Sequence, residues 1–294
     1  MIAADVAQSG HGMELGLKGR TAAVTGGSKG IGFAIAEEFA REGVNLHLAA
    51  RSGDDLERAA KDLKSRFDVT VNVHPVDLSD CDMRDAFATQ CADVDILINC
   101  AGAIPGGTLD QVSEAAWRAA WDLKLFGYVG TTRIVYDRMC ERRRGVIVNV
   151  VGAGGILTNA GYICGGPGNA ALINFTISMG GASVRHGVRV CGVNPGPVDT
   201  DRISYLRQID EEKVPAGERD AWNRRYFQAM AYGRPARADE VSGMVAFLAS
   251  DRATYISGAM VTIDGGLVAR HGAPGVAIET DRVHTKSTEA GRKA

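Results

Sequence analysis

The stretch "TAAVTGGSKGIGFAIAEEFAREG", residues 21–43, decides the fold because a glycine-rich loop joins its short apolar strand to a helix. The glycines allow a tight turn and let backbone N–H groups approach a phosphate at the positive end of the helix. A strand, such a loop and a helix in direct succession predict a dinucleotide-binding loop. Its predicted contact residues are Gly26, Ser28, Lys29, Gly30, Ile31 and Gly32.

The end of the second predicted strand indicates which dinucleotide is bound. In "LHLAARS", residues 46–52, Arg51 stands where an acidic residue would accept the ribose hydroxyls of NAD. Lys29 adds a second positive charge within the glycine loop. Both side chains attract a 2′-phosphate, so we expect NADP(H) to be preferred over NAD(H).

Short apolar runs alternate with longer amphipathic segments through most of the chain. Strands are predicted at 21–26, 44–50, 70–75, 94–99, 145–151, 188–193 and 259–263. Helices are predicted at 30–42, 54–66, 80–90, 113–140, 168–184 and 238–249. The strands lack polar alternation, as expected for a parallel sheet covered on both faces. The pattern predicts an α/β fold with one doubly wound sheet.

Composition excludes several classes of function. The 294 residues are 45% hydrophobic and carry a net charge of −2, so no global field favours nucleic acid or an anionic membrane. No apolar run is long enough for a membrane span, and no secretory signal is present, so we expect a cytoplasmic protein. The cysteines stand far from one another and from histidines in sequence, which argues against zinc and predicts no metal site.

Five ordered motifs carry a family resemblance: "TGGSKGIG" (25–32), "VDLSD" (76–80), "INCAG" (98–102), "NPGPVDT" (194–200) and "VTIDGG" (261–266). Over residues 17–267 the chain resembles the short-chain dehydrogenase/reductase family. The resemblance implies a single Rossmann-type domain with seven parallel strands. It also implies a homodimer or homotetramer, formed through the helices at 113–140 and 168–184.

The resemblance assigns further residues to the cofactor. Asp77 is expected at the adenine, and Asn99 is expected to pair with backbone near the ribose and to stabilise the central sheet. The remaining predicted contacts are Leu78, Ala101, Gly102, Pro195, Gly196, Val198 and Thr200. The resemblance also predicts a substrate lid at 201–237, although its many charges are equally compatible with a solvated helical face. We expect a flexible leader at 1–16, the domain at 17–269 and a loose tail at 270–294.

The catalytic residues of the resembled family have no counterparts in an ungapped alignment. That family uses a tyrosine, a lysine four residues later, a serine and an asparagine. Alignment through "NAALINFT" puts the lysine position at Asn169, the tyrosine position at Gly165 and the serine position at Gly152. Lys124 stands where the asparagine is expected. The family mechanism therefore cannot be carried over residue by residue.

The substitutions suggest a rebuilt site. A tyrosine needs a nearby cation to act as an acid–base group at neutral pH, because its phenol titrates near pH 10. We expect Tyr162 to be that group, on the loop before the helix, with its ring in the space left by Gly152 and Gly165. Lys124 would supply the cation, and Asn169 would hold water, substrate or ribose. The alternative is that Tyr162 packs as a loop aromatic and Lys124 extends to solvent.

The predicted function is an NADP(H)-dependent oxidoreductase that interconverts a carbonyl and an alcohol in a small-molecule substrate. Two alternatives remain open at this point. One is an NADP(H)-binding protein without hydride chemistry, acting as a redox sensor or a partner subunit. The other is a lyase or isomerase that uses Lys124 or Tyr162 for proton transfer alone.

Overall fold

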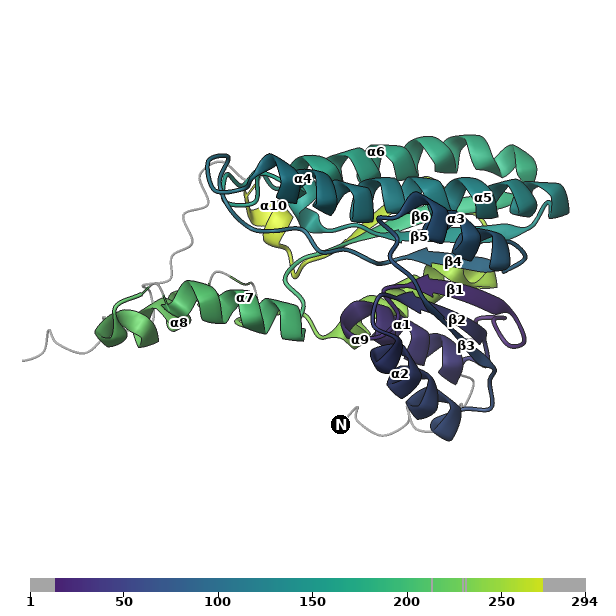
Figure 1. The fold of residues 1–294 in the computed structure, drawn as a ribbon, viewed down its shortest axis with the longest axis horizontal. Coiled ribbons are helices and arrows are strands. Elements are labelled where there is room, and N and C mark those ends of the chain that lie inside the picture. Colours follow the sequence, from purple (N-terminus) through teal and green to yellow (C-terminus); the bar gives the residue numbers. More distant parts are fainter. Residues whose placement is uncertain (1–13, 213, 229, 231, 272–294) are drawn as a thin grey trace, which may run out of the picture.

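A computed structural model describes residues 14–212, 214–228, 230 and 232–271 of the chain (Figure 1). Seven parallel strands form one sheet in the order β3-β2-β1-β4-β5-β6-β7. The strands are β1 Thr21–Thr25, β2 Asn45–Ala50, β3 Val71–Pro75, β4 Ile96–Asn99, β5 Gly145–Val150, β6 Val188–Pro195 and β7 Met260–Ile263. Each predicted strand is present, and its ends differ from the predicted ones by no more than two residues. The expected seven-stranded Rossmann-type domain is confirmed.

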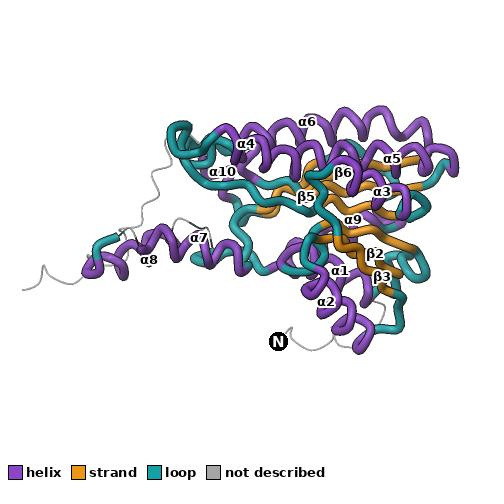
Figure 2. The backbone as a smooth tube through the Cα atoms, viewed as in Figure 1, coloured by secondary structure: helices purple, strands orange, loops and turns teal. Residues whose placement is uncertain are grey.

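Helices cover both faces of this sheet, as the buried, apolar central strands require. One layer contains α1 Gly30–Arg41, α2 Gly53–Arg66 and α9 Ala238–Ala249. The opposite layer contains α3 Cys81–Gln90, α4 Glu114–Trp121, α5 Gly127–Arg142 and α6 Gly165–Ser183. Figure 2 shows the strands running between these two layers. Short 3-10 turns lie at Ala153–Gly155, Val184–His186, Ala216–Glu218 and Asp251–Ala253.

The core follows the alternation of side chains along each strand. On β1, Ala22 and Val24 face the layer of α1, whereas Ala23 faces the layer of α3 and α5. Every residue of β5 is buried. Because both faces of the central strands are covered in this way, only the loops at the strand ends remain available for ligands.

The long helix predicted at 113–140 is interrupted. Between α4 and α5, residues Asp122–Phe126 form a π-helical turn, which has one more residue per hydrogen-bonded ring than an α-helix. Sequence periodicity does not reveal such a turn, because the apolar positions continue on both sides of it. The wide turn carries Lys124, and turns of this kind occur frequently at functional sites.

Four other helices add to or differ from the predicted ones. The helix predicted at 168–184 begins three residues earlier, at Gly165, so Tyr162 lies on the loop immediately before it. Segment 201–237 contains α7 Asp201–Glu212 and α8 Arg219–Gln228, which project away from the sheet in Figure 1. A final short helix, α10, spans Leu267–His271. The expected leader and tail lie largely outside the described residues.

The base of segment 201–237 is closed by backbone hydrogen bonds. The N–H of Asp199 donates to Ala236 O over 2.7 Å, and the N–H of Ala236 donates to Pro197 O over 2.9 Å. These two bonds join the strand end after β6 to the chain that enters α9. The two helices between them therefore form an excursion with a fixed base, as a lid would need.

The structure bears on the expectations about membrane spans and metal sites. Within the described part of the chain, no helix is sufficiently long and apolar to cross a bilayer. The cysteines and histidines stand far apart in sequence, which predicted no metal site, but the fold brings His47, His74 and Cys91 together beside α3. Strand register and helix packing place these residues together. Neither can be read from the spacing of residues along the sequence.

Candidate active site

The predicted cofactor loops meet at the carboxyl ends of β1 and β4, where the strand order reverses. Thr25 ends β1, and its hydroxyl oxygen accepts hydrogen bonds from the N–H groups of Cys100 (2.9 Å) and Ala101 (3.2 Å). A Cβ on Gly26 would lie 3.0 Å from Ala101 Cα. Only glycine lets the two loops approach this closely.

The glycine loop has the backbone geometry of a phosphate cradle. Gly26 (φ 70°) and Gly30 (φ 58°) adopt left-handed conformations, and a Cβ on Gly32 would overlap Gly26 O. The N-cap of α1, Lys29, makes no side-chain capping bond, so its side chain does not occupy the first N–H groups of the helix. Thr200 lies against Gly30 from the loop after β6. These features fit the pyrophosphate of a dinucleotide.

Charged residues surround the predicted adenosine position. Arg51 follows β2 and is exposed. The Lys29 ammonium lies 3.7 Å from an Asp55 carboxylate oxygen. Lys29 therefore forms an ion pair with the start of α2. Hydrogen bonds from Ser79 lower the pKa of Asp77, and the charge of Arg51 lowers that pKa further. Asp77 is therefore an anionic acceptor near Arg51 at neutral pH.

Asn99 has a different environment from the one expected. It is fully buried, and its amide nitrogen donates to Thr132 Oγ1 (3.0 Å) and Asn149 Oδ1 (2.9 Å) rather than to backbone. The Asn149 amide nitrogen donates in turn to Thr176 Oγ1 over 2.9 Å. The expected backbone pairing is wrong, because side chains of α5 and β5 occupy the amide nitrogen. Asn99 therefore joins the central sheet to α5 directly and to α6 through Asn149.

Lys124 lies at the carboxyl ends of β4 and β5. Its ammonium donates a 2.6 Å hydrogen bond to the carbonyl of Val151, directly after β5. A Cβ on Gly102 would lie 3.1 Å from Lys124 Cδ, so the lysine stem runs along the loop after β4. The π-helical turn thus places a positive charge in the crevice, and the expected alternative in which Lys124 extends to solvent is wrong.

Two contacts fix the loop that carries Tyr162. The N–H of Gly107 donates to Gly161 O over 2.7 Å, and Tyr162 forms a short parallel bridge with Gly107. From the end of α4, the Trp121 indole N–H donates to Cys164 O over 3.0 Å. The backbone on both sides of Tyr162 is therefore held, which limits where its ring can lie.

The ring of Tyr162 lies over the first residue of α6. A Cβ on Gly165 would overlap the Tyr162 ring, and a Cβ on Gly154 would lie 3.0 Å from its Cε1. Gly165 therefore leaves the space that the ring fills, as expected. The expected contribution of Gly152 is wrong, since a Cβ on Gly152 would meet Asn169 Nδ2 at 3.1 Å. Gly154 provides the second space instead.

Buried amides near these side chains lack partners among the described residues. Asn169 is 2% exposed and its carbonyl oxygen accepts no hydrogen bond, and neither polar atom of the Asn194 side chain is paired. A buried polar group without a partner costs about 1–3 kcal/mol, so such groups normally bind something. Both residues lie at the carboxyl side of the sheet, near the loops predicted to bind the cofactor, and they fit a polar ligand there.

Comparison with known proteins gives a consistent assignment. Residues 20–210 match the family model for short chain dehydrogenases. The chain belongs to this family. It is 29% identical to the 3-oxoacyl-[acyl-carrier-protein] reductase FabG of Chlamydia trachomatis, over 85% of this chain and 98% of the relative. It is 31% identical to nodulation protein G of a Rhizobium species, with the same two coverages.

Solved structures agree with this assignment. The L-sorbose reductase of Gluconobacter frateurii, crystallised with NADPH and L-sorbose, superposes with a TM-score of 0.80 at 29% identity. The match covers 87% of this chain and 99% of the reductase. The chain is therefore an oxidoreductase of the short-chain dehydrogenase family, with the family fold over nearly its whole described length.

Sequence reasoning assigned no role to Asn194 or to Tyr128, which lie beside the candidate site. Tyr128 is 1% exposed, and its hydroxyl donates to Val150 O over 2.8 Å. Burial raises its pKa well above the usual value, and the nearby Cys100 and Tyr162 raise that pKa further. Burial also raises the pKa of Cys100 to about 12, against the opposing charge of Lys124. The only sequence signal was helical spacing, since Tyr128 follows Lys124 by four residues.

Proposed function

We propose that this dehydrogenase interconverts a carbonyl and an alcohol with NADP(H), and that Tyr162 transfers the proton. The observation that carries the proposal is the Tyr162 ring lying over Gly165, on a loop held from both sides. Lys124, on the neighbouring π-helical turn, supplies the positive charge in the same crevice. The names of the relatives support carbonyl reduction, because FabG is a 3-oxoacyl reductase and the structural neighbour reduces L-sorbose.

The glycine loop and the loops after β4 and β6 would hold the cofactor, which supplies a hydride to the carbonyl carbon when bound. Gly26, Gly30 and Gly32 would admit the pyrophosphate to the start of α1. Asp77 would accept hydrogen bonds from the adenine. Arg51 is the support for NADP(H) over NAD(H), because its exposed guanidinium can pair bidentately with a 2′-phosphate.

Residues of the chain itself would donate and accept the proton. The Tyr162 phenol donates to the oxygen of a bound carbonyl and accepts the proton in the reverse direction. A phenolate is stabilised by a neighbouring cation, and Lys124 is the positive group that the π-helical turn brings to this crevice. The unpaired carbonyl oxygen of Asn169 would accept a hydrogen bond from water or from a substrate hydroxyl, which completes the polar surroundings.

A second candidate is an NADP(H)-binding protein without hydride chemistry. The positions that align with the family's catalytic asparagine, serine, tyrosine and lysine favour it, because none keeps the family residue. They hold Lys124, Gly152, Gly165 and Asn169. A crevice that retains the cofactor loops and has lost the proton donor would bind a dinucleotide without consuming it. The tyrosine over Gly165 is the reason to prefer the enzymatic function.

Transfer of deuterium from labelled NADPH tests the proposal. The protein is incubated with NADPH deuterated at C4 and with a panel of ketones, ketoses and 3-oxoacyl thioesters. We expect an alcohol product with one deuterium on the former carbonyl carbon, measured by mass spectrometry. A product without deuterium and without NADPH loss would identify a lyase or isomerase. Tight NADPH binding with no product from any carbonyl would support the binding protein instead.

The cofactor preference is tested with the same assay. Arg51→Asp is expected to lower the ratio of kcat/KM for NADPH over NADH by about 10- to 100-fold, since a hydrogen bond to a charged group is worth about 1.5–3 kcal/mol. Arg58→Asp is the matched control, because Arg58 is also exposed on this side and pairs with Asp55 on α2. An unchanged ratio in Arg51→Asp would remove the basis for preferring NADP(H).

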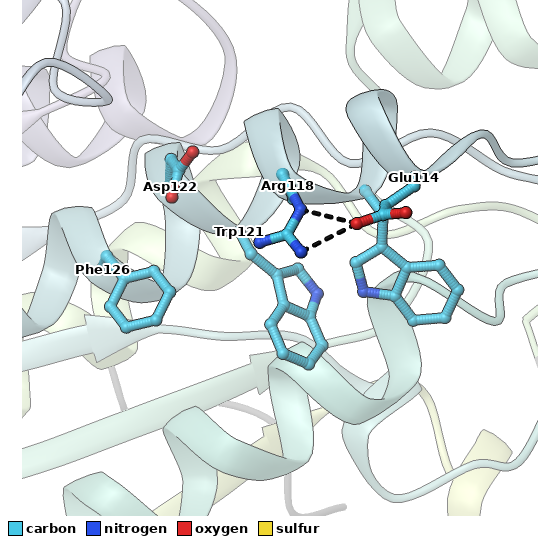
Figure 3. A pocket seen from close by; sticks show the side chains of 6 residues that line it. Glu114, Arg118, Trp121, Asp122 and Phe126 are labelled. Atoms are coloured by element: carbon cyan, nitrogen blue, oxygen red, sulfur yellow. Dashed lines mark hydrogen bonds and ion pairs between the residues drawn. The ribbon is translucent and has the colours of Figure 1, made fainter.

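We also propose self-association through the outer layer of α4, α5 and α6, which lie together on one side of the sheet (Figure 1). Phe126 is 53% exposed and Ile177 is 48% exposed, so this layer presents large apolar side chains to solvent. Figure 3 shows the pocket on this surface, which is lined by Glu114, Trp117, Arg118, Trp121, Asp122 and Phe126. An apolar, hollowed surface of this kind supports a homodimer or homotetramer.

Light scattering measures the assembly directly. We expect a mass two or four times that of the chain, and a smaller assembly for Ile177→Glu, because a buried carboxylate would oppose association. Met83→Glu, at an equally exposed apolar residue of α3, should leave the mass unchanged. A single-chain mass for the unmodified protein would contradict the proposal.

The six free cysteines support a reducing, cytoplasmic location.

A further inference from the structure

Two histidines and a cysteine come together near the edge of the sheet that is formed by β2 and β3. His47 Nδ1 lies 2.9 Å from His74 Nε2, and Cys91 Sγ lies 3.9 Å from the same His74 nitrogen. All three donor atoms lie within 4.8 Å of one another. Both histidines are half-buried and Cys91 is buried. None of these residues belongs to the candidate active site.

The strand register explains why these side chains meet. His74 on β3 pairs with Ala49 on β2, and His47 lies two residues before Ala49. Residues two apart on a strand point to the same face, so both histidines face the layer of α3. Cys91 caps the carboxyl end of α3 and packs in the same core cluster as Ala49. The ligands therefore come from three elements that the core fixes relative to one another.

We propose that His47, His74 and Cys91 bind a Zn²⁺ ion through two imidazole nitrogens and one thiolate. Zinc takes these ligands tetrahedrally, at about 2.0–2.1 Å from nitrogen and about 2.3 Å from sulfur. Around one ion, the three donor atoms would then be separated by about 3.3–3.6 Å. The observed separations of 2.9 and 3.9 Å differ from these values by about half an ångström, and the third pair, His47 Nδ1 and Cys91 Sγ, lies within 4.8 Å, so side-chain rotation must bring these two atoms together. A water molecule would take the fourth position.

The two histidines suit this ligand set as they stand, whereas Cys91 must lose a proton before it can bind. Burial lowers the pKa of both His47 and His74, so both imidazoles are neutral at neutral pH and offer a lone pair. Burial raises the pKa of the Cys91 thiol to about 12, so the metal must displace that proton. Each zinc ion bound therefore releases one proton to solvent. The proton shared between the two ring nitrogens moves to the outer nitrogen of its ring.

The position of the ion suggests a structural role. His74 precedes Asp77 by three residues, on the strand that leads to the predicted adenine loop. An ion there would tie β2, β3 and α3 together without contacting Lys124 or Tyr162. The site is therefore independent of the proposed oxidoreductase chemistry, and so is its test.

Cobalt is the probe, because Co²⁺ takes zinc sites and is coloured. Reduced, chelator-treated protein is titrated with Co²⁺, and the absorption spectrum is followed. We expect one equivalent to bind, with a thiolate-to-cobalt charge-transfer band and the visible bands of tetrahedral cobalt, and we expect Zn²⁺ to remove both. Cys91→Ala should abolish the charge-transfer band, and His74→Ala should weaken binding by at least about tenfold.

Matched controls separate this site from adventitious binding. Cys140→Ala and His186→Ala alter a cysteine and a histidine elsewhere in the fold and should leave the titration unchanged. The proposal fails if the folded, unmodified protein shows no charge-transfer band. It also fails if the band persists in Cys91→Ala. The first criterion needs no variant, so it stands even where a substitution in the core impairs folding.

Discussion

Tyr162→Phe is expected to lower kcat for carbonyl reduction by about 10²–10⁴-fold, the range in which general acid–base groups contribute. That loss corresponds to about 3–5.5 kcal/mol of transition-state stabilisation. The substitution removes one oxygen atom and keeps the ring that fills the space at Gly165. The loop and α6 should therefore remain in place. The measurement is the rate of NADPH oxidation with the best carbonyl from the panel.

Two further readouts show that the loss is chemical. The dissociation constant for NADPH, measured by fluorescence, should change little in Tyr162→Phe, because the proposed pyrophosphate and adenosine contacts come from other loops and do not involve this hydroxyl. Tyr255→Phe is the control. Tyr255 is fully exposed and precedes β7, at the amino ends of the strands, whereas the crevice lies at their carboxyl ends. Full activity in Tyr162→Phe would exclude this residue as the proton donor.

Gly165→Ala is expected to lower kcat by about 10²-fold through displacement of the Tyr162 ring. A Cβ at this position would overlap the ring, so the ring must move. A misplacement of about 1 Å in a catalytic group can cost this much. Gly165 is the first residue of α6, so alanine adds little helix stability there, and the displaced ring should lower the stability of the protein by about 1–3 kcal/mol. A slower and less stable enzyme, measured by NADPH oxidation and thermal unfolding, is the expected combination.

The same helix provides a matched control. Gly181 lies in α6 with open space where its Cβ would be, so Gly181→Ala should stabilise the helix and leave kcat unchanged. Comparing the two alanines separates the effect on Tyr162 from the effect on the helix. Equal activity in both variants would mean that the position of the Tyr162 ring does not matter for catalysis.

The sheet was predictable because apolar strands and amphipathic helices alternate through most of the chain. The central strands read as short apolar runs, as for "VIV" at 146–148, and the glycine loop fixes where the first helix begins. The carboxyl ends of parallel strands then fall on one edge, so the loops after β1, β4 and β6 had to meet. The crevice follows from topology alone.

The details of the site were not predictable in the same way. The π-helical turn at Lys124 leaves no mark in the apolar periodicity, and Gly154 had no feature to distinguish it from Gly152. Asn99 was assigned a backbone partner, although Thr132 and Asn149 reach its amide. These errors share one cause. Each depends on which side chain reaches a given atom first, and that is set by packing between elements distant in sequence.

The central claim is that Tyr162 provides the proton for hydride transfer, and one distance in a crystal structure with NADP⁺ tests it. That distance joins the Tyr162 hydroxyl oxygen to nicotinamide C4. We predict about 5 Å or less, which lets a carbonyl oxygen bound at C4 lie within hydrogen-bond reach of the phenol. A Tyr162 hydroxyl pointing away from the nicotinamide, with only glycine facing C4, would contradict the account.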